Sequence, residues 1–172
     1  MFDLLLNPNG RIQRNRFWQG MVILTVASVL VAAGSVKLGM LFGLLTYALI
    51  YPYICVYGKR LHDAGFTAWL VLVVWIGTFV LSVILNAVLT PFFMSPEEIA
   101  IQEEVAERML AGDMAGVVEG TQILATALLP LTLIITVVVN AAAAFVVGML
   151  PSQPTENKHG PAPGTSSADT FS

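Results

Sequence analysis

The chain has 172 residues, of which 56% are hydrophobic and only 11% are charged, and its formal net charge is −3. Soluble domains carry about 25% charged residues, so a water-soluble fold of this size could not bury so much apolar surface. No basic domain is present that DNA or RNA could contact, and the sequence predicts no nucleic-acid partner.

A short lead, residues 1–16, precedes the first long apolar stretch. It contains Arg11, Arg14 and Arg16, and the run Asn7-Pro8-Asn9-Gly10 predicts a turn. We expect this lead to lie at the membrane interface on the cytoplasmic side. Each basic side chain near anionic headgroups contributes on the order of 1 kcal/mol to such an attachment.

Four apolar stretches are long enough to cross a bilayer, whose hydrocarbon core takes about 20 helical residues. They contain no Asp, Glu, Lys, Arg or His and cover residues 17–36, 38–57, 69–93 and 121–150. The last is long for one crossing, and Pro130 gives it a place to kink or tilt. The sequence therefore predicts an all-α membrane protein, a four-helix transmembrane bundle over residues 17–150.

The loop between the third and fourth stretches is acidic and contains a helix-start signal. Ser95 suits an N-cap, Pro96 suits the first helical position, and Glu98 completes a capping box. We expect an extra acidic amphipathic helix over about 96–111. Since its glutamates gain nothing from anionic headgroups, we expect it to pack against the protein's own outer face.

Basic residues gather on one side of the predicted membrane. Arginines precede the first stretch, Lys59 and Arg60 lie between the second and third, and the acidic loop holds one arginine, Arg108. Lysine and arginine in short loops mark the cytoplasmic side of an inner membrane. Both termini should then be cytoplasmic, and residues 151–172, rich in Pro, Ser, Thr and Gly, should form a mostly flexible tail.

A compact group of titratable residues follows the second stretch: Arg60, His62 and Asp63. A histidine beside an aspartate can act as a general base or as half of a metal site. The other ligands that a metal needs have no suitable place, because His159 lies in the predicted tail and Cys55 lies within a span. We predict no catalytic residue, metal site or cofactor, and expect Asp63 to pair with Arg60 or with an N-terminal arginine.

Three segments together resemble one family. Residues 10–18 are similar to a motif G-R-x-x-R-x-x-[FY]-W, residues 59–69 to R-R-L-H-D-x-G-x-S-G-W, and residues 157–163 to N-x-[YF]-G-P-x-P. This is the DUF805 family of small bacterial inner-membrane proteins, to which no activity is assigned. The chain departs from the motifs at Lys59 and Ala68 and at His159, where the family has an aromatic residue. The resemblance implies four spans. All three segments fall on the cytoplasmic side of the topology that the charges predict, where 157–163 could dock.

These observations define a candidate inner-face cluster: Arg11, Arg14, Arg60, His62 and Asp63, with Trp18 and Trp69 at the interface. We interpret the protein as a non-enzymatic module that binds membrane lipid headgroups or a partner protein through this face. One alternative is a small transporter or channel formed by oligomers of the chain. A further alternative is a membrane enzyme that acts on a headgroup, with His62 and Asp63 as acid and base.

Overall fold

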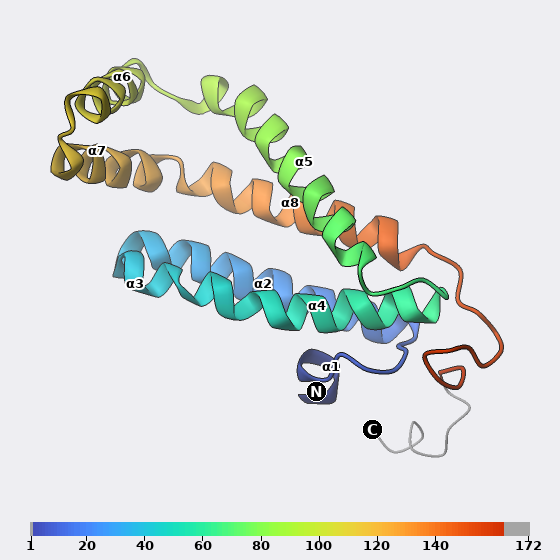
Figure 1. Ribbon diagram of the computed structural model, residues 1–172. Helices are drawn as coiled ribbons and strands as arrows, with labels where there is room; N and C mark the ends of the chain where they lie inside the picture. The colour runs from blue at the N-terminus through green and yellow to red at the C-terminus, as the bar shows by residue number, and fades with distance from the viewer. Residues whose placement is uncertain (1, 164–172) are drawn as a thin grey trace.

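A computed structural model describes residues 2–163 of the protein, and its regular elements in that range are all helices (Figure 1). Four of the described helices are long and apolar enough to cross a membrane. They are α2 (Arg14–Leu38), α4 (Leu45–Asp63), which the short α3 (Met40–Gly43) precedes, α5 (Leu70–Phe93) and α8 (Leu129–Gly148). The expected all-α fold with four membrane-spanning helices is therefore confirmed.

Helices α2 and α8 form the centre of the arrangement. Helix α2 packs against both α4 and α8, and α8 packs against α5. Helix α5 diverges from α4 beyond the turn that joins them (Figure 1). The short helix α1 (Phe2–Leu6), the α4–α5 turn and residues 149–163 share one end of the molecule, which we call the basic end. The opposite end, the acidic end, contains α3, α6 (Pro96–Ala111) and α7 (Met114–Ala127).

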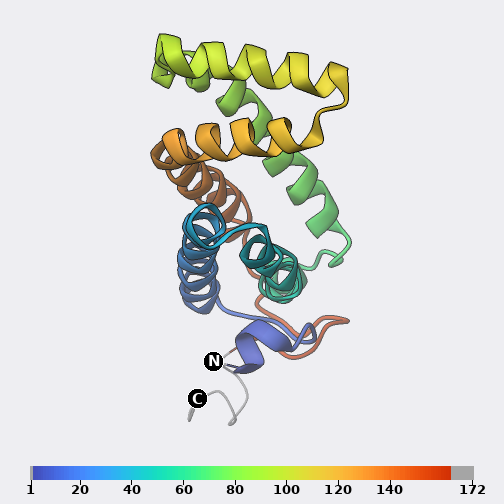
Figure 2. The same cartoon turned by 90° about the vertical axis from the view of Figure 1, so that its left-hand side faces the viewer.

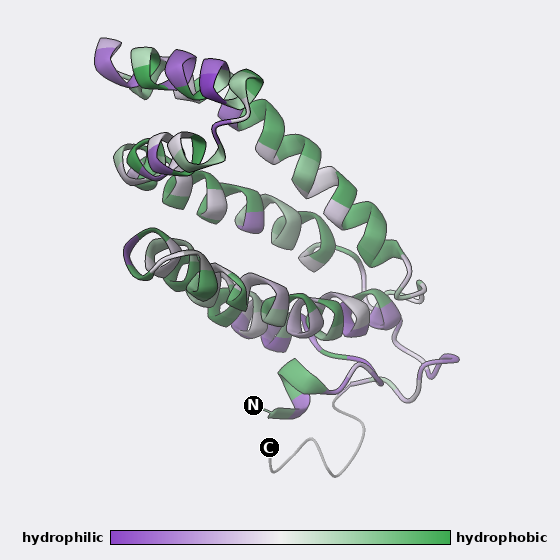
Figure 3. Cartoon of the chain, turned by 60° about the vertical axis from the view of Figure 1, so that its left-hand side comes forward, coloured by the Kyte–Doolittle hydropathy of each residue, from purple (hydrophilic) through white to green (hydrophobic). Residues whose placement is uncertain are grey.

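The larger of the two clusters of buried apolar residues lies near the basic end. Phe17 is fully buried there, with edge-to-face contacts to Trp18 and Tyr57 at 5.8 and 5.7 Å between ring centroids. Gly20 allows α2 to approach α4, since a Cβ atom at this position would lie 3.0 Å from a methyl group of Val56. Small residues permit such close helix contact in lipid, where packing rather than hydrophobic exclusion drives association. The outer surfaces of the spans are apolar, and polar residues concentrate on α6 and at the basic end (Figure 3).

Helix α6 begins where the sequence predicts. The Ser95 hydroxyl accepts a hydrogen bond from the Glu98 amide at 3.3 Å, and the Glu98 carboxylate accepts one from the Ser95 amide at 2.6 Å. The helix packs on α7, and the two lie across the acidic end of the bundle (Figure 2). Every residue of α6 is at least partly exposed, and its amphipathic character stays a prediction.

The fourth apolar stretch does not form one helix over 121–150. Helix α7 ends at Ala127, and α8 begins at Leu129 with Pro130 in its first turn. Proline lacks an amide hydrogen and clashes with the preceding turn, so it suits a helix start and not a helix interior. The 20 residues of α8 span about 30 Å, the thickness of a bilayer core. Residues 121–127 therefore belong to the acidic end.

The second span extends further toward the basic end than its hydropathy indicates. Helix α4 continues to Asp63, so Gly58–Asp63 is helical and not part of a loop. The chain then reverses through Gly65, whose φ of 83° lies in the left-handed region that glycine tolerates best. As a result, the backbone of α4 fixes the positions of Lys59, Arg60 and Asp63.

Candidate functional site

Asp63, the last residue of α4, is the centre of the charged group at the basic end. Its carboxylate accepts a hydrogen bond from Arg60 Nη1 at 2.5 Å on one oxygen. The other oxygen accepts from Arg11, at 3.0 Å from Nη2 and 3.2 Å from Nε. The side chains of Arg60 and Asp63 are fully buried, and that of Arg11 is 1% exposed. We call these three residues the Arg–Asp clasp.

Arg60 also joins α4 to the end of α8. Its Nη2 donates to the carbonyl oxygens of Gly148, at 3.0 Å, and Leu150, and its Nη1 donates to the Ser152 hydroxyl at 2.9 Å. The last carbonyls of a helix have no partner within the helix and carry partial negative charge. A buried guanidinium therefore stabilises the end of α8 as well as Asp63.

Arg11 holds the segment after α8 against the rest of the basic end. It donates to the carbonyl oxygens of Gln153, Thr155 and Gly160 at 2.5, 2.8 and 3.3 Å. The Gln153 amide donates in turn to the Asp63 carbonyl at 2.9 Å. Residues 151–163 are thus bound to the clasp, where we expected a mostly flexible tail. Residues 164–172 of that tail lie outside the described residues.

His62 and His159 stack in parallel, with ring centroids 3.7 Å apart and 8° between the planes. His62 Nδ1 lies 3.1 Å from the carbonyl oxygen of Gly10, which requires a proton on Nδ1. The Asn157 side chain donates to the His62 carbonyl at 3.0 Å, beside this stack. His159 therefore makes the kind of contact that the aromatic residue of the family motif could make.

The geometry does not pair His62 with Asp63 as acid and base. The arginines take both oxygens of Asp63, and Nδ1 of His62 faces a backbone carbonyl. Among residues 2–163, no three His, Cys, Asp or Glu side chains come together as metal ligands would.

The other predicted members of the inner-face cluster lie around the clasp and not in it. Arg14 is exposed in the first turn of α2. Trp18 packs near Gly148, where a Cβ atom would come within 2.9 Å of its ring. Trp69, which precedes α5, is 77% exposed. The structure therefore brings Arg11, Arg60 and Asp63 into contact, places His62 beside them and leaves Arg14 accessible.

Two groups of polar contacts were not expected from the sequence. Lys59 is 1% exposed, and its ammonium group donates to the carbonyl of Asp3 at 2.5 Å, which attaches α1 to α4. Within the spans, the Tyr53 hydroxyl donates to Asn140 Oδ1 at 2.7 Å and lies 3.0 Å from the Ser28 hydroxyl. Asn140 was the available signal, because a polar side chain in an apolar span needs a partner.

A comparison with protein families agrees with this geometry. A family model described as "Protein of unknown function (DUF805)" matches residues 5–161. The chain belongs to the DUF805 family. Neither the curated proteins nor the solved structures gave a match to the chain. In this DUF805 protein, the three motif segments are far apart in sequence, yet all three meet at the Arg–Asp clasp. They contribute Arg11, Arg60 with Asp63, and the carbonyl of Gly160, which accepts from Arg11.

Proposed function

We propose that this protein is a non-enzymatic module of the bacterial inner membrane, with both termini in the cytoplasm, that binds anionic lipid headgroups at its basic end. The observation that carries the proposal is the start of α2. Its first turn holds Arg14 and Arg16 and no acidic residue, and Gln13 at the N-cap makes no side-chain cap bond.

A basic residue such as Arg14 in this position is electrostatically unfavourable unless an anion is close to it. The N-terminus of a helix carries about half a positive charge, and a cation beside it typically costs 0.3–1 kcal/mol. A phosphate group placed there would accept hydrogen bonds from first-turn amides and pair with the guanidinium of Arg14. Arg14 is exposed, so it is accessible to such a group from the membrane surface.

The clasp has a different part in this proposal. The donors of Arg11 and most of those of Arg60 are engaged by Asp63 and by backbone carbonyls, so neither guanidinium is free for a headgroup. The clasp instead holds the segment before α2, the end of α4 and the segment after α8 together. The enzyme alternative gains no support, because His62 and Asp63 are bonded to other groups.

The lipid preference of Arg14 variants tests the proposal. Purified protein is placed in nanodiscs of equal parts phosphatidylglycerol and phosphatidylcholine. Native mass spectrometry then counts the lipids of each kind that stay bound to the protein after it is released from the nanodisc. Arg14→Ala should lower the preference for phosphatidylglycerol about fivefold, the equivalent of about 1 kcal/mol. The matched control is Lys37→Ala, which removes a cation from the last turn of the same helix.

Orientation is tested separately by labelling single cysteines in intact cells. A cysteine at Glu103 should react with an impermeant reagent, and one at Lys158 should not. An unchanged lipid preference in Arg14→Ala would refute the headgroup site. Labelling at Lys158 would refute the cytoplasmic placement of the basic end.

A further inference from the structure

The four spanning helices line a pocket of about 330 Å³ that contains several polar side chains. Each helix contributes at least one hydroxyl or amide side chain: Ser28, Tyr53, Tyr57, Thr78, Thr136 and Asn140. None of the lining residues is charged. Polar side chains are costly in lipid unless they are hydrogen-bonded or face a polar cavity.

Most of these side chains have partners within the protein. Tyr53 bonds to Asn140 and Ser28, and Thr78 donates to the carbonyl of Trp75 at 2.8 Å. Tyr57 differs from them. It is only 2% exposed, and no hydrogen bond to its hydroxyl is found among residues 2–163.

The ring of Tyr57 is held in place, so its hydroxyl has little freedom to find a partner elsewhere. It packs edge-to-face on Phe17, and it stacks with Tyr53 at 6.1 Å between centroids. The hydroxyl oxygen keeps accessible surface within the pocket, since it is not among the fully buried polar atoms that lack a partner. A ligand hydroxyl in the pocket is therefore placed to form a hydrogen bond with it.

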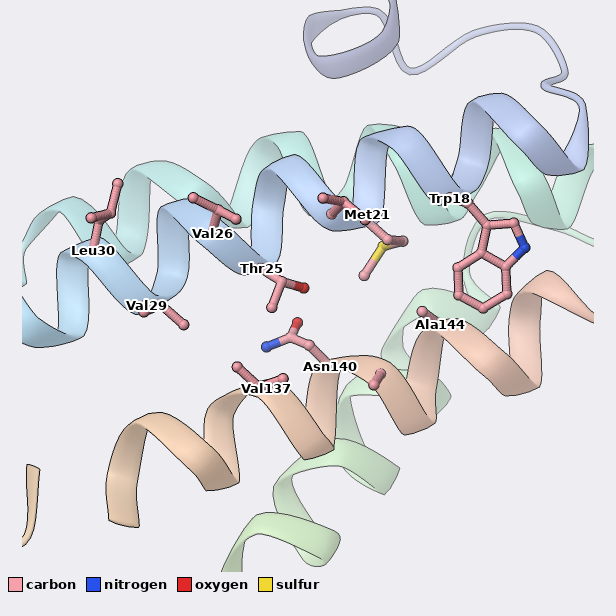
Figure 4. A pocket seen from close by; sticks show the side chains of 11 residues that line it. Trp18, Met21, Thr25, Val26, Val29, Leu30, Val137, Asn140 and Ala144 are labelled. Carbon is pink, nitrogen blue, oxygen red and sulfur yellow. The ribbon is translucent and has the colours of Figure 1, made fainter. Parts of the chain in front are cut away.

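A second cavity adjoins the polar pocket at Asn140. This groove, of about 480 Å³, lies between α2 and α8 and is lined almost entirely by apolar side chains. Figure 4 shows Asn140 on α8 and Thr25 on α2 pointing toward each other across it, with Met21 and Val137 beside them. Because Asn140 lines both cavities, a polar pocket and an apolar groove meet at one side chain.

We propose that these cavities bind an uncharged amphiphile from the bilayer, with its hydroxyl group in the polar pocket and its alkyl chain in the groove. The absence of charged lining residues excludes an ionic head, since an unpaired charge is expensive in this environment. A hydroxyl can both donate to and accept from Tyr57. Diacylglycerols and long-chain prenols carry this chemistry.

Trp75 lines the polar pocket and Trp18 lines the groove, so tryptophan fluorescence reports occupancy of both. Trp69→Phe removes the remaining, exposed tryptophan. In nanodiscs of that variant, dibrominated dioleoylglycerol at low mole fraction should quench the fluorescence saturably. Unlabelled dioleoylglycerol or geranylgeraniol should reverse the quenching. The more effective competitor shows whether the natural ligand is a diacylglycerol or a prenol. Brominated phosphatidylcholine, which has no free hydroxyl, should quench only in proportion to its concentration.

Tyr57→Phe, in the same background, should require about three- to tenfold more diacylglycerol for half-saturation. Tyr47→Phe is the matched control: it makes the same change on the same helix, on a side chain that is 70% exposed and lines neither cavity. If Tyr57→Phe is poorly folded by circular dichroism, Thr78→Val replaces it.

The site goes beyond the proposed headgroup function, so Arg14→Ala should leave the quenching curve unchanged. Quenching that never saturates in the Trp69→Phe protein would overturn the proposal, as would equal curves for the Tyr57→Phe and Tyr47→Phe variants.

Discussion

The two ends of this DUF805 protein both contain ion pairs between arginine and a carboxylate, but the pairs differ in burial and in what they connect. At the basic end, Asp63 is fully buried and binds Arg60 and Arg11, the latter 52 residues away. At the acidic end, Arg108 pairs with Glu104 one helical turn away, and both side chains remain more than one-third exposed. Only the first arrangement joins segments that are distant in the sequence.

Burial explains the difference in what each group contributes. Two charges out of water interact strongly, but each has lost its hydration, so removing one partner leaves the other uncompensated. An exposed pair keeps most of its hydration, and water and salt screen its attraction. The basic end should therefore be sensitive to single substitutions, and the acidic end should be tolerant of them.

The largest effect is expected from Asp63. Asp63→Ala leaves Arg60 and Arg11 buried without their carboxylate and should destabilise the protein by about 3–5 kcal/mol. Thermal unfolding in detergent micelles, followed by circular dichroism, measures this loss. Glu156→Ala removes an exposed carboxylate near the same end and should melt as the wild type does. If the two variants melt alike, the buried clasp contributes nothing to stability.

A smaller and more local effect is expected from Arg11. Arg11→Ala removes the donors that hold the carbonyls of Gln153 and Thr155, and hydrogen bonds from charged groups contribute about 1.5–3 kcal/mol. Residues 151–163 should then detach while the spans stay folded. Hydrogen exchange at the Gln153 amide, which bonds to the Asp63 carbonyl, should become much faster.

Arg14→Ala serves as the control for this experiment, because Arg14 is exposed and outside the clasp. Equal exchange at Gln153 in both variants would show that Arg11 does not hold the segment.

The contacts that the sequence could predict are the local ones. The pairing of Asp63 with Arg60 follows from their spacing within one helical turn. The cap at Ser95 follows from the residue types of the four-residue segment 95–98. That Arg11, rather than Arg14 or Arg16, completes the clasp depends on how the turn at Gly10 directs the chain, with φ at 89°. Spacing in the sequence carries no information on that choice.

Residues 151–163 and the fourth span show two further limits of prediction from the sequence. Residues 151–163 bind the clasp largely through backbone carbonyls, which every sequence possesses, so composition alone indicated flexibility. Only the family motif at 157–163 indicated that part of this segment could dock. The break at Leu128 lies between apolar residues on both sides, and hydropathy alone could not place it. Pro130 was the residue that indicated the break, because proline suits the first turn of a helix, and here it lies in the first turn of α8 and does not kink a longer helix.

At the acidic end, the largest expected effect belongs to the helix cap. Ser95→Ala removes the acceptor of the Glu98 amide and should cost about 1 kcal/mol of local stability in α6. Faster hydrogen exchange at the first-turn amides of α6, with little change in the overall melting temperature, is the expected result. Ser95→Asp should restore protection, because aspartate caps helices equally well. Protection that is unaffected by Ser95→Ala would contradict the capping role.

The smallest effect is expected from the exposed ion pair. Glu104→Gln removes the charge that Arg108 contacts at 2.5 Å, but Arg108 keeps a second carboxylate, Asp113, at 3.8 Å. Exposed pairs one turn apart on a helix contribute little, and salt weakens them further. We expect the melting temperature of Glu104→Gln to match that of Glu103→Gln, which removes a neighbouring exposed charge from the same helix. A drop for Glu104→Gln alone, larger than that of Ser95→Ala and persistent in high salt, would show that the acidic end depends on its ion pair as the basic end depends on its clasp.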